Sequence, residues 1–195
     1  ASSIGEMIDR IMAYLPVSLD HDIATCIYCS ILTDTGSFRY SNTTPSALRV
    51  AAKMIELGVS PWEMTKRIYE SDPPERVRLL ALVLQTLELA PEGRYGSIRI
   101  NRTMLEESDA TEDMTDSFIN YPRGIQGVEV AIQFREQDDD RIKVSFRSTG
   151  SINVADIAES FGGGGHRNAA GCTQTGSFKE IRDRVYRAVE SALTE

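Results

Sequence analysis

The chain has 195 residues, of which 41% are hydrophobic and 26% are charged, and its formal net charge is −8. This composition is typical of a globular protein with a buried core, and it excludes a largely disordered chain. Acidic residues outnumber basic residues in both halves, so neither half is a basic platform for long nucleic acids. No run of 18 apolar residues occurs, so no segment is predicted to span a membrane.

Three cysteines are too few for a disulfide framework, which favours a reducing, cytoplasmic compartment. Cys26 and Cys29 form a C-x-x-C motif, but they lie in an apolar run of helical length, and no second ligand pair has suitable spacing for zinc. We therefore interpret them as small packing residues of a helix. The first residues lack an initiator Met and a signal-peptide pattern, so we expect the chain to be part of a longer protein.

Four helices are predicted in the first 71 residues. Ser3 and Glu6 form a capping box ahead of apolar residues at helical spacing, which indicates the first helix. Asp20 is the expected N-cap of the second helix. The third and fourth helices each begin at a hydroxyl residue followed by proline. The predicted buried stripe of the third helix consists of Ala47, Leu48, Ala51, Met54 and Ile55.

A further helix is predicted from Val77 to Leu89, after which the hydrophobic period changes. Three segments then alternate between apolar and polar residues, which indicates half-buried strands of one sheet. The acidic segment Asp138–Asp140 favours a hairpin between the last two strands. A short helix after Asn153 and a final helix after Ser177 follow. The three predicted strands are Tyr95–Ile100, Val128–Arg135 and Ile142–Arg147.

These patterns predict an α/β (α+β) fold with a mixed sheet. We expect a helical part over residues 1–75, a linker helix over residues 76–92 and an α+β domain over residues 93–195.

The strongest functional signal is the ten-residue run Gly-Gly-Gly-Gly-His-Arg-Asn-Ala-Ala-Gly, residues 162–171. Consecutive glycines let the backbone turn sharply and expose its amides to an anion, and the histidine adds a switchable donor. A mobile linker with an exposed histidine is the alternative interpretation. The run lies between a capped helix and a strand-like segment, where a linker has no purpose, so we favour a ligand-binding loop.

Two further residues are candidates for a site. Arg147 ends the last predicted strand and is close in sequence to the glycine run, so its guanidinium is a credible donor to a phosphate or a base. For Arg135, Arg141 and Lys143, on the same polar face, we prefer a solvated surface. Asp34 lies among small residues just after an apolar run, where it could project into a site or could belong to an ordinary helix C-terminal loop.

Residues 34–44, Asp-Thr-Gly-Ser-Phe-Arg-Tyr-Ser-Asn-Thr-Thr, resemble the last conserved motif of the DHH phosphoesterase domain. Residues 162–171 resemble the signature of the DHH-associated C-terminal domain, and Phe146-Arg147-Ser148 matches its usual strand ending. Their order and spacing are similar to the nanoRNase and pAp-phosphatase group, where pAp is adenosine 3′,5′-bisphosphate. By this resemblance residues 1–75 are the C-terminal part of the DHH domain and residues 93–195 the DHH-associated domain.

The resemblance implies an enzyme that uses two manganese ions to hydrolyse short oligoribonucleotides from the 3′ end, or pAp to AMP. Asp34 is then implied as a metal ligand and catalytic residue. The glycines of the run are implied to leave room for the nucleotide next to the backbone. Side chains around these glycines are implied to bind it. The residues implied in substrate binding are Arg147, Ser148, Gly164, Gly165 and His166.

The early metal ligands of the family, a His-x-x-x-Asp-x-Asp run and the Asp-His-His triplet, are absent, because the chain has two histidines in total, His21 and His166. Asp20-His21-Asp22 is better interpreted as a helix cap. We therefore expect an incomplete metal site and a chain that is inactive alone. Its expected partners are short RNA or a mononucleotide, without a membrane, and a homodimer is one expected assembly. The alternatives are a cyclic-dinucleotide phosphodiesterase, an exopolyphosphatase-like hydrolase or a non-catalytic nucleic-acid-binding module.

Overall fold

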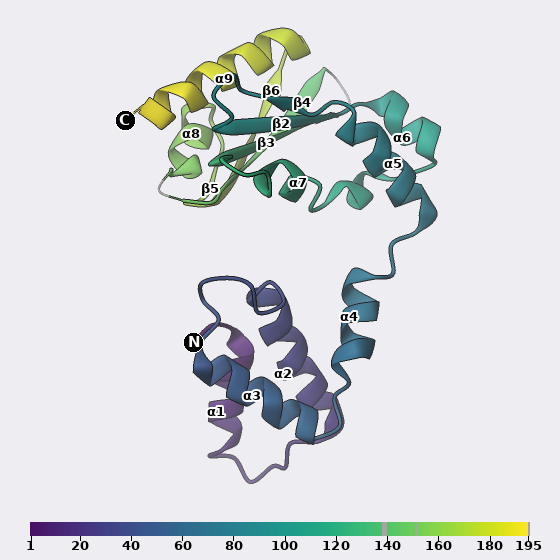
Figure 1. Ribbon diagram of the computed structural model, residues 1–195, viewed down its shortest axis with the longest axis vertical. Helices are drawn as coiled ribbons and strands as arrows, with labels where there is room; N and C mark the ends of the chain where they lie inside the picture. The colour runs from purple at the N-terminus through teal and green to yellow at the C-terminus, as the bar shows by residue number, and fades with distance from the viewer. Residues whose placement is uncertain (138–139, 151, 195) are drawn as a thin grey trace. The chain divides into compact units, whose positions relative to one another are not determined.

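The computed structural model describes residues 1–137, 140–150 and 152–194 of the chain. They form two compact units that divide between Ser71 and Asp72 (Figure 1). The described residues hold nine α-helices, one short 3-10 helix and one six-stranded mixed sheet, so the predicted α/β class is confirmed. No helix among them is both long enough and apolar enough to cross a bilayer.

The first unit is helical and is built around α2 (His21–Asp34). Asp20 caps this helix by accepting a hydrogen bond from the backbone N–H of Ile23 at 2.9 Å, which confirms the cap predicted from the sequence. Aliphatic side chains of α2 and α3 (Pro45–Glu56) form the core of the unit. The other two helices are α1 (Ile4–Met12) and α4 (Pro61–Tyr69).

Helix α1 meets α2 through its small and polar side. A Cβ at Gly5 would meet the backbone oxygen of Ile27 at 2.7 Å, and the N–H of Gly5 donates to the hydroxyl of Ser30 at 3.1 Å. The apolar stripe of α1 points elsewhere, since Met7 and Ile11 are 53% and 55% exposed. The amphipathic helix predicted from the sequence forms, but the described residues do not cover its apolar side.

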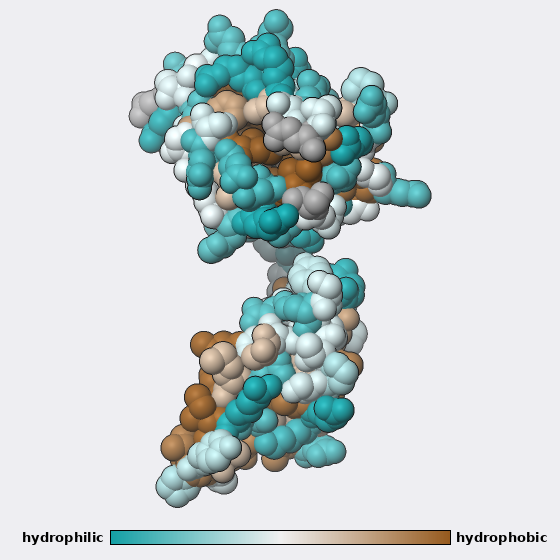
Figure 2. All heavy atoms as spheres, turned by 90° about the vertical axis from the view of Figure 1, so that its left-hand side faces the viewer, coloured by the Kyte–Doolittle hydropathy of each residue, from teal (hydrophilic) through white to brown (hydrophobic). Residues whose placement is uncertain are grey.

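The predicted buried stripe of α3 is only partly buried. Its small residues and Met54 lie in the core, whereas Leu48 and Ile55 are 48% and 43% exposed, so the prediction is wrong for those two. The physical reason is that α3 packs mainly on α2, and one neighbour covers only part of a helix circumference. Figure 2 shows apolar side chains gathered on the surface of the first unit.

A six-stranded sheet forms the centre of the second unit, in the order β1-β2-β3-β4-β6-β5. β2 and β3 are parallel, and every other neighbouring pair is antiparallel. All three segments predicted as strands lie in this one sheet, which confirms that prediction, although Asp138 and Asp139 of the hairpin tip lie outside the described residues. The strands are β1 (Glu88–Leu89), β2 (Tyr95–Ile100), β3 (Val130–Glu136), β4 (Arg141–Ser148), β5 (Gly164–His166) and β6 (Ala169–Thr175).

The two faces of the sheet are covered differently (Figure 1). α8 and α9 pack on one face, against strand residues such as Ile132, Val144 and Phe146, and form the larger core. On the other face, α7 lies over β2 and β3, and β4 and β5 keep exposed residues, Lys143 and His166. The helices of this unit are α5 (Pro74–Leu84), α6 (Arg102–Ser108), η1 (Glu112–Thr115), α7 (Asn120–Arg123), α8 (Val154–Ser160) and α9 (Phe178–Thr194).

The helix predicted over residues 77–89 ends at Leu84, so the second half of that prediction is wrong. Thr86 marks the change, because its hydroxyl accepts a hydrogen bond from the backbone N–H of Arg99, in β2, at 2.8 Å. The next residues form β1 and pair with β2. The free edge of β2 therefore competes with the helix for these backbone hydrogen bonds.

The chain lies close against β6 because Gly163, just before β5, and Gly165, within β5, carry no side chains. A Cβ at Gly163 would meet the backbone oxygen of Gly171 at 2.2 Å, and one at Gly165 would meet the Cα of Ala170 at 2.6 Å. Gly165 also has a φ of 149°, which residues with a side chain rarely adopt. Between them, Gly164 has no atom within 4 Å of the position that its Cβ would take.

Replacing Gly163 by alanine should destabilise the chain, because the new methyl group overlaps backbone atoms of β6. Overpacking of this kind costs about 1–3 kcal/mol in the free energy of unfolding. The matched change Gly164→Ala adds the same methyl to open space and should change that free energy by less than about 0.5 kcal/mol. Urea unfolding followed by circular dichroism measures both, and equal losses would contradict this account of the contact.

Candidate functional site

Arg147 and His166 lie in one row across the sheet. Arg147 pairs with Ala169 of β6, and Ala169 pairs in turn with His166 of β5. Directly opposed residues on neighbouring strands point to the same face of a sheet. The two side chains therefore leave the same face from Cα atoms about 10 Å apart, with only the methyl group of Ala169 between them.

A floor of small residues adjoins this row. The next row on the same face consists of Gly164, Gly171 and Ser145. Because a Cβ at Gly164 would meet nothing within 4 Å, the fold itself does not require glycine there. The floor is therefore low and open, and a ligand can approach the backbone closely.

Ser148 and Gly165, which were also predicted for the site, are not brought onto this face. Successive strand residues point to opposite faces, so Ser148 points away from Arg147. Its buried hydroxyl donates to the backbone oxygen of Ile152 and accepts from Asn168 Nδ2, both at 2.9 Å. Gly165 is used for the close contact with β6. Both residues therefore shape the loops beside the row.

A polar cleft of about 110 Å³ opens beside Arg147. One wall is the sheet, and the other is the connection that crosses from β2 to β3 through η1 and α7. His166 lies on the same face of the sheet but does not line this cleft. The cleft is lined by Thr115, Asp116, Ser117, Ile119, Gln133, Arg135, Lys143, Ser145 and Arg147.

Two arginines hold the crossover wall in place. Arg76 of α5 donates to the backbone oxygen of Asp116 at 2.6 Å and to the hydroxyl of Ser117 at 2.9 Å. Arg135 of β3 donates to the backbone oxygen of Glu112 at 3.0 Å and forms an ion pair with its carboxylate at 3.1 Å. The wall is thus tied to a helix and to the sheet, which gives the cleft a defined width.

Arg147 is half-buried at the side of the cleft, and its Nη1 donates to the backbone oxygen of Phe146 at 3.0 Å. Burial, with the charge of Arg123, lowers the pKa of Arg147, and Asp116 acts in the opposite direction. Arginine stays charged at any pH a protein experiences, so the shift reflects a position where positive charge is poorly compensated. A bound anion would compensate it.

Sequence reasoning missed Gln133, Ser145 and the crossover residues of the cleft. Gln133 and Ser145 follow the polar alternation of β3 and β4. The pairing of β3 with β4, the strand that carries Arg147, was therefore a usable signal. The crossover residues carry no such pattern. Arg135 was expected on a solvated face, and that prediction is wrong, because its side chain is 13% exposed and is used to hold the crossover. Lys143 is exposed, as the sequence suggested.

The motif around Asp34 forms a tight loop at the end of α2. Asp34 is the last helical residue and its side chain is exposed, while Thr35 behind it is buried. Three consecutive residues, 36–38, then adopt the left-handed conformation, with φ values of 55°, 59° and 63°. Ser37 and Phe38 carry side chains, so each costs of the order of 1–3 kcal/mol in that conformation. Backbone strain of this kind is concentrated at functional sites.

Side chains of the same motif hold the loop. Asn42 Nδ2 donates to the backbone oxygen of Asp34 at 3.0 Å and to that of Ser2 at 3.2 Å. Arg39 Nε donates to the backbone oxygen of Gly36 at 2.8 Å. These contacts fix the backbone at Asp34 and leave its carboxylate exposed.

Asp34 does not form a complete metal site with its neighbours. Across residues 1–137, 140–150 and 152–194, no three His, Cys, Asp or Glu side chains are grouped closely enough to bind one ion. A two-metal centre needs several such ligands around each ion. The described residues therefore do not fit a complete centre of that kind.

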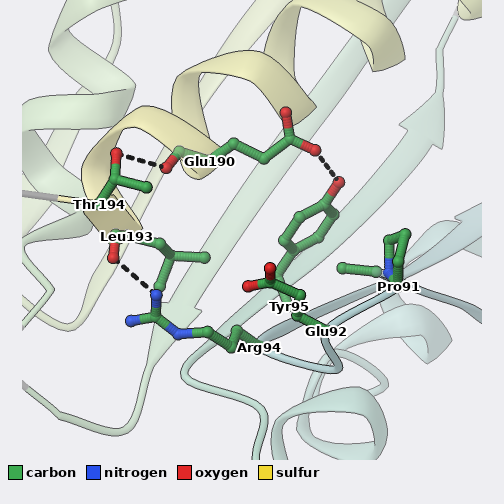
Figure 3. A pocket seen from close by; sticks show the side chains of 8 residues that line it. Pro91, Glu92, Arg94, Tyr95, Glu190, Leu193 and Thr194 are labelled. Carbon is green, nitrogen blue, oxygen red and sulfur yellow. Dashed lines mark hydrogen bonds between the residues drawn. The ribbon is translucent and has the colours of Figure 1, made fainter.

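A larger hollow, of about 280 Å³, lies beside the last turns of α9 (Figure 3). Its polar groups pair with one another: Tyr95 donates to Glu190 at 2.8 Å, and Arg94 donates to the backbone oxygen of Leu193 at 2.7 Å. Burial and the bond to Glu190 raise the pKa of Tyr95. Because these groups are already satisfied, we interpret this hollow as a packing feature.

The chain is similar to known proteins along its whole length. A model of the DHHA1 domain matches residues 97–193. A curated relative from Thermus thermophilus, "Bifunctional oligoribonuclease and PAP phosphatase NrnA", is 36% identical over 194 residues, which are 99% of this chain and 58% of that protein. A Bacillus subtilis protein of the same name is 32% identical over 200 residues, covering 100% of this chain and 61% of that protein.

Among solved structures, an exopolyphosphatase-related protein from Bacteroides fragilis superposes with a TM-score of 0.89 at 25% identity, covering all of this chain and 56% of that one. The chain spans about three fifths of the length of the two curated relatives. Residues 97–193 therefore form a DHHA1 domain, and the chain is similar to these NrnA relatives along its whole length.

Proposed function

We propose that this chain is the nucleotide-binding part of a phosphoester hydrolase that cleaves short oligoribonucleotides or converts pAp to AMP. The names of the relatives from Thermus thermophilus and Bacillus subtilis support this reaction class. Because the chain spans only part of those relatives, the activity is proposed for a protein of their full length.

The observation that carries the proposal is the row of Arg147, Ala169 and His166 on one face of the sheet. A guanidinium can bind two phosphate oxygens at once, and an imidazole can donate to a phosphate or stack against a base. The small residue between them and the open floor at Gly164 leave room for one nucleotide.

The same geometry favours a short ligand. The row extends over about 10 Å, and the cleft beside it holds about 110 Å³. A long polyanion would also meet a chain with a net charge of −8, which opposes binding away from this local site. Short RNA or a mononucleotide is therefore the preferred substrate.

We propose further that Asp34 supplies one ligand to a manganese centre whose other ligands come from outside this chain. Its exposed carboxylate on a strained, hydrogen-bonded loop supports this role. When bound, the metal would activate water and stabilise the charge of the reacting phosphate. The part that this chain plays is to hold the Asp34 carboxylate and the nucleotide.

A second candidate function is an exopolyphosphatase-like activity. The solved structure from Bacteroides fragilis carries that description, and Arg147 and Lys143 are suited to inorganic phosphates as well as to nucleotides. Polyphosphate has no base or ribose, however, and would leave the open floor at Gly164 unused.

The 195-residue chain should bind ribodinucleotides and pAp, and Arg147→Ala or His166→Ala should weaken binding about tenfold or more, because each removes a charged or switchable donor. Isothermal titration calorimetry measures the dissociation constants. Lys179→Ala is the control, since that side chain lies on α9 and is 83% exposed. A similar loss in the control would show that net charge alone attracts the ligand, and tighter binding of polyphosphate would favour the second candidate function.

Gly164→Val should fold normally and yet weaken dinucleotide binding about tenfold, because its Cβ lies in open space and the added side chain occupies the floor. Thr173→Val is the control, as it places a valine on the same face farther along β6 and only exchanges a hydroxyl for a methyl group. The unfolding temperature and the dissociation constant are measured on the same samples. Unchanged binding by the Gly164 variant would remove the floor from the proposed site.

With manganese added, the chain alone should bind dinucleotides and pAp without hydrolysing them, since it brings only Asp34 from the implied ligand set. Release of mononucleotides or phosphate is followed by chromatography, with buffer and metal as the blank. Metal-dependent turnover by the isolated chain would contradict the proposal that the remaining ligands come from elsewhere.

A further inference from the structure

Gln133 lies in the middle of β3, on the same face of the sheet as Arg147, and is 9% exposed. Its side-chain oxygen, Oε1, is buried and has no hydrogen-bond partner among the described residues. A buried acceptor without a donor is unfavourable, and native proteins leave few of them. Gln133 nevertheless lines the polar cleft, so a ligand in that cleft lies beside this side chain.

Two hydroxyl groups of the cleft are already used within the protein. Ser117 accepts a hydrogen bond from Arg76, and Thr115 accepts one from Arg135 at 3.2 Å. Gln133 differs from them because its oxygen has no such contact, although the residue lines the cleft. The oxygen is therefore an acceptor for which the described residues supply no donor.

The position of Gln133 relative to Arg147 indicates which part of a ligand it meets. Gln133 in β3 pairs with Ser145 in β4, and Arg147 lies two residues beyond Ser145 in β4. Gln133 and Arg147 are therefore diagonal neighbours, with Cα atoms about 7–8 Å apart. Phosphate oxygens are drawn to the guanidinium and repelled by the amide oxygen. A neutral hydroxyl or amino group next to the phosphate is the suitable partner for Gln133.

We propose that Gln133 is a specificity-determining residue, which accepts a hydrogen bond from a neutral O–H or N–H group of the nucleotide that Arg147 holds. This inference rests on the proposed nucleotide binding and adds to it the group that is recognised. Two sources offer that chemistry, the ribose 2′-hydroxyl and an amino group of the base. A cleft of about 110 Å³ admits either group.

The test measures binding by the intact 195-residue chain, and by Gln133→Met, which keeps the length of the side chain and removes the acceptor. Four dinucleotides serve as probes: the diadenosine ribodinucleotide, its 2′-deoxy analogue, its analogue with purine in place of adenine, and the analogue with both changes. Gln137→Met is the matched control, because Gln137 lies just past β3 and does not line this cleft.

The unchanged chain should bind the ribodinucleotide about five- to tenfold more tightly than one of the singly changed analogues. In Gln133→Met the ratio of these two dissociation constants should be close to one. Loss of the ribo-to-deoxy ratio identifies the 2′-hydroxyl, and loss of the adenine-to-purine ratio identifies the base. Gln137→Met should keep the original ratios. The Gln133→Met chain should unfold at the same temperature as the unchanged chain or a higher one, because an unsatisfied buried acceptor has been removed.

Arg135 Nε is also buried without a partner, two residues along β3, and a hydrogen bond between it and Gln133 is the structural alternative. In that case Gln133→Met would lower the unfolding temperature and leave every ligand ratio unchanged, which overturns the inference. Gln133→Glu provides a second variant, since it keeps an acceptor and should retain the ratio. Binding of nucleotides with unchanged ratios overturns this inference only, whereas no nucleotide binding by the unchanged chain overturns the proposed function as well.

Discussion

The close contact between β5 and β6 is the constraint on which the site of the second unit depends. Because Gly163 and Gly165 have no side chains, the chain can leave α8, reverse direction and lie flat as the edge strand. That position puts His166 in register with Ala169 and so in the same row as Arg147. A larger residue at either glycine would lift β5 from β6 and move the imidazole away from the guanidinium.

The two faces of the sheet differ in how much of them is buried in apolar contacts. The face under α8 and α9 buries most of the aliphatic and aromatic residues of the unit, and a second apolar cluster covers the β2 end of the opposite face. The rest of that opposite face keeps groups that contribute little to the core: a half-buried arginine, an unsatisfied amide oxygen and a glycine with open space above it. Each of these features is unfavourable or neutral for folding, and each is suited to contact with a polar ligand.

Much of the fold could be predicted from the sequence, because helix caps and strand alternation are local signals. Asp20 and the strands over residues 95–147 are examples. The apolar residues of α1 were misleading for a physical reason: periodicity shows that a helix is amphipathic but not what covers it. Arg147 and His166 became candidates through their types and neighbours in the sequence. Gln133 and the crossover were not, since their roles depend on pairing between residues that are far apart in the sequence, such as Arg76 and Asp116.

The crossover between β2 and β3 has a further consequence. Two parallel strands cannot be joined by a tight turn, so the topology demands a long connection over one face of the sheet. In this protein that obligatory connection is also a wall of the cleft. Substitutions in it change the shape of the cleft while the ladder of the sheet stays the same. A family with this topology can thus evolve new ligand preferences through the exposed residues of one segment, without a change in the pairing of its strands.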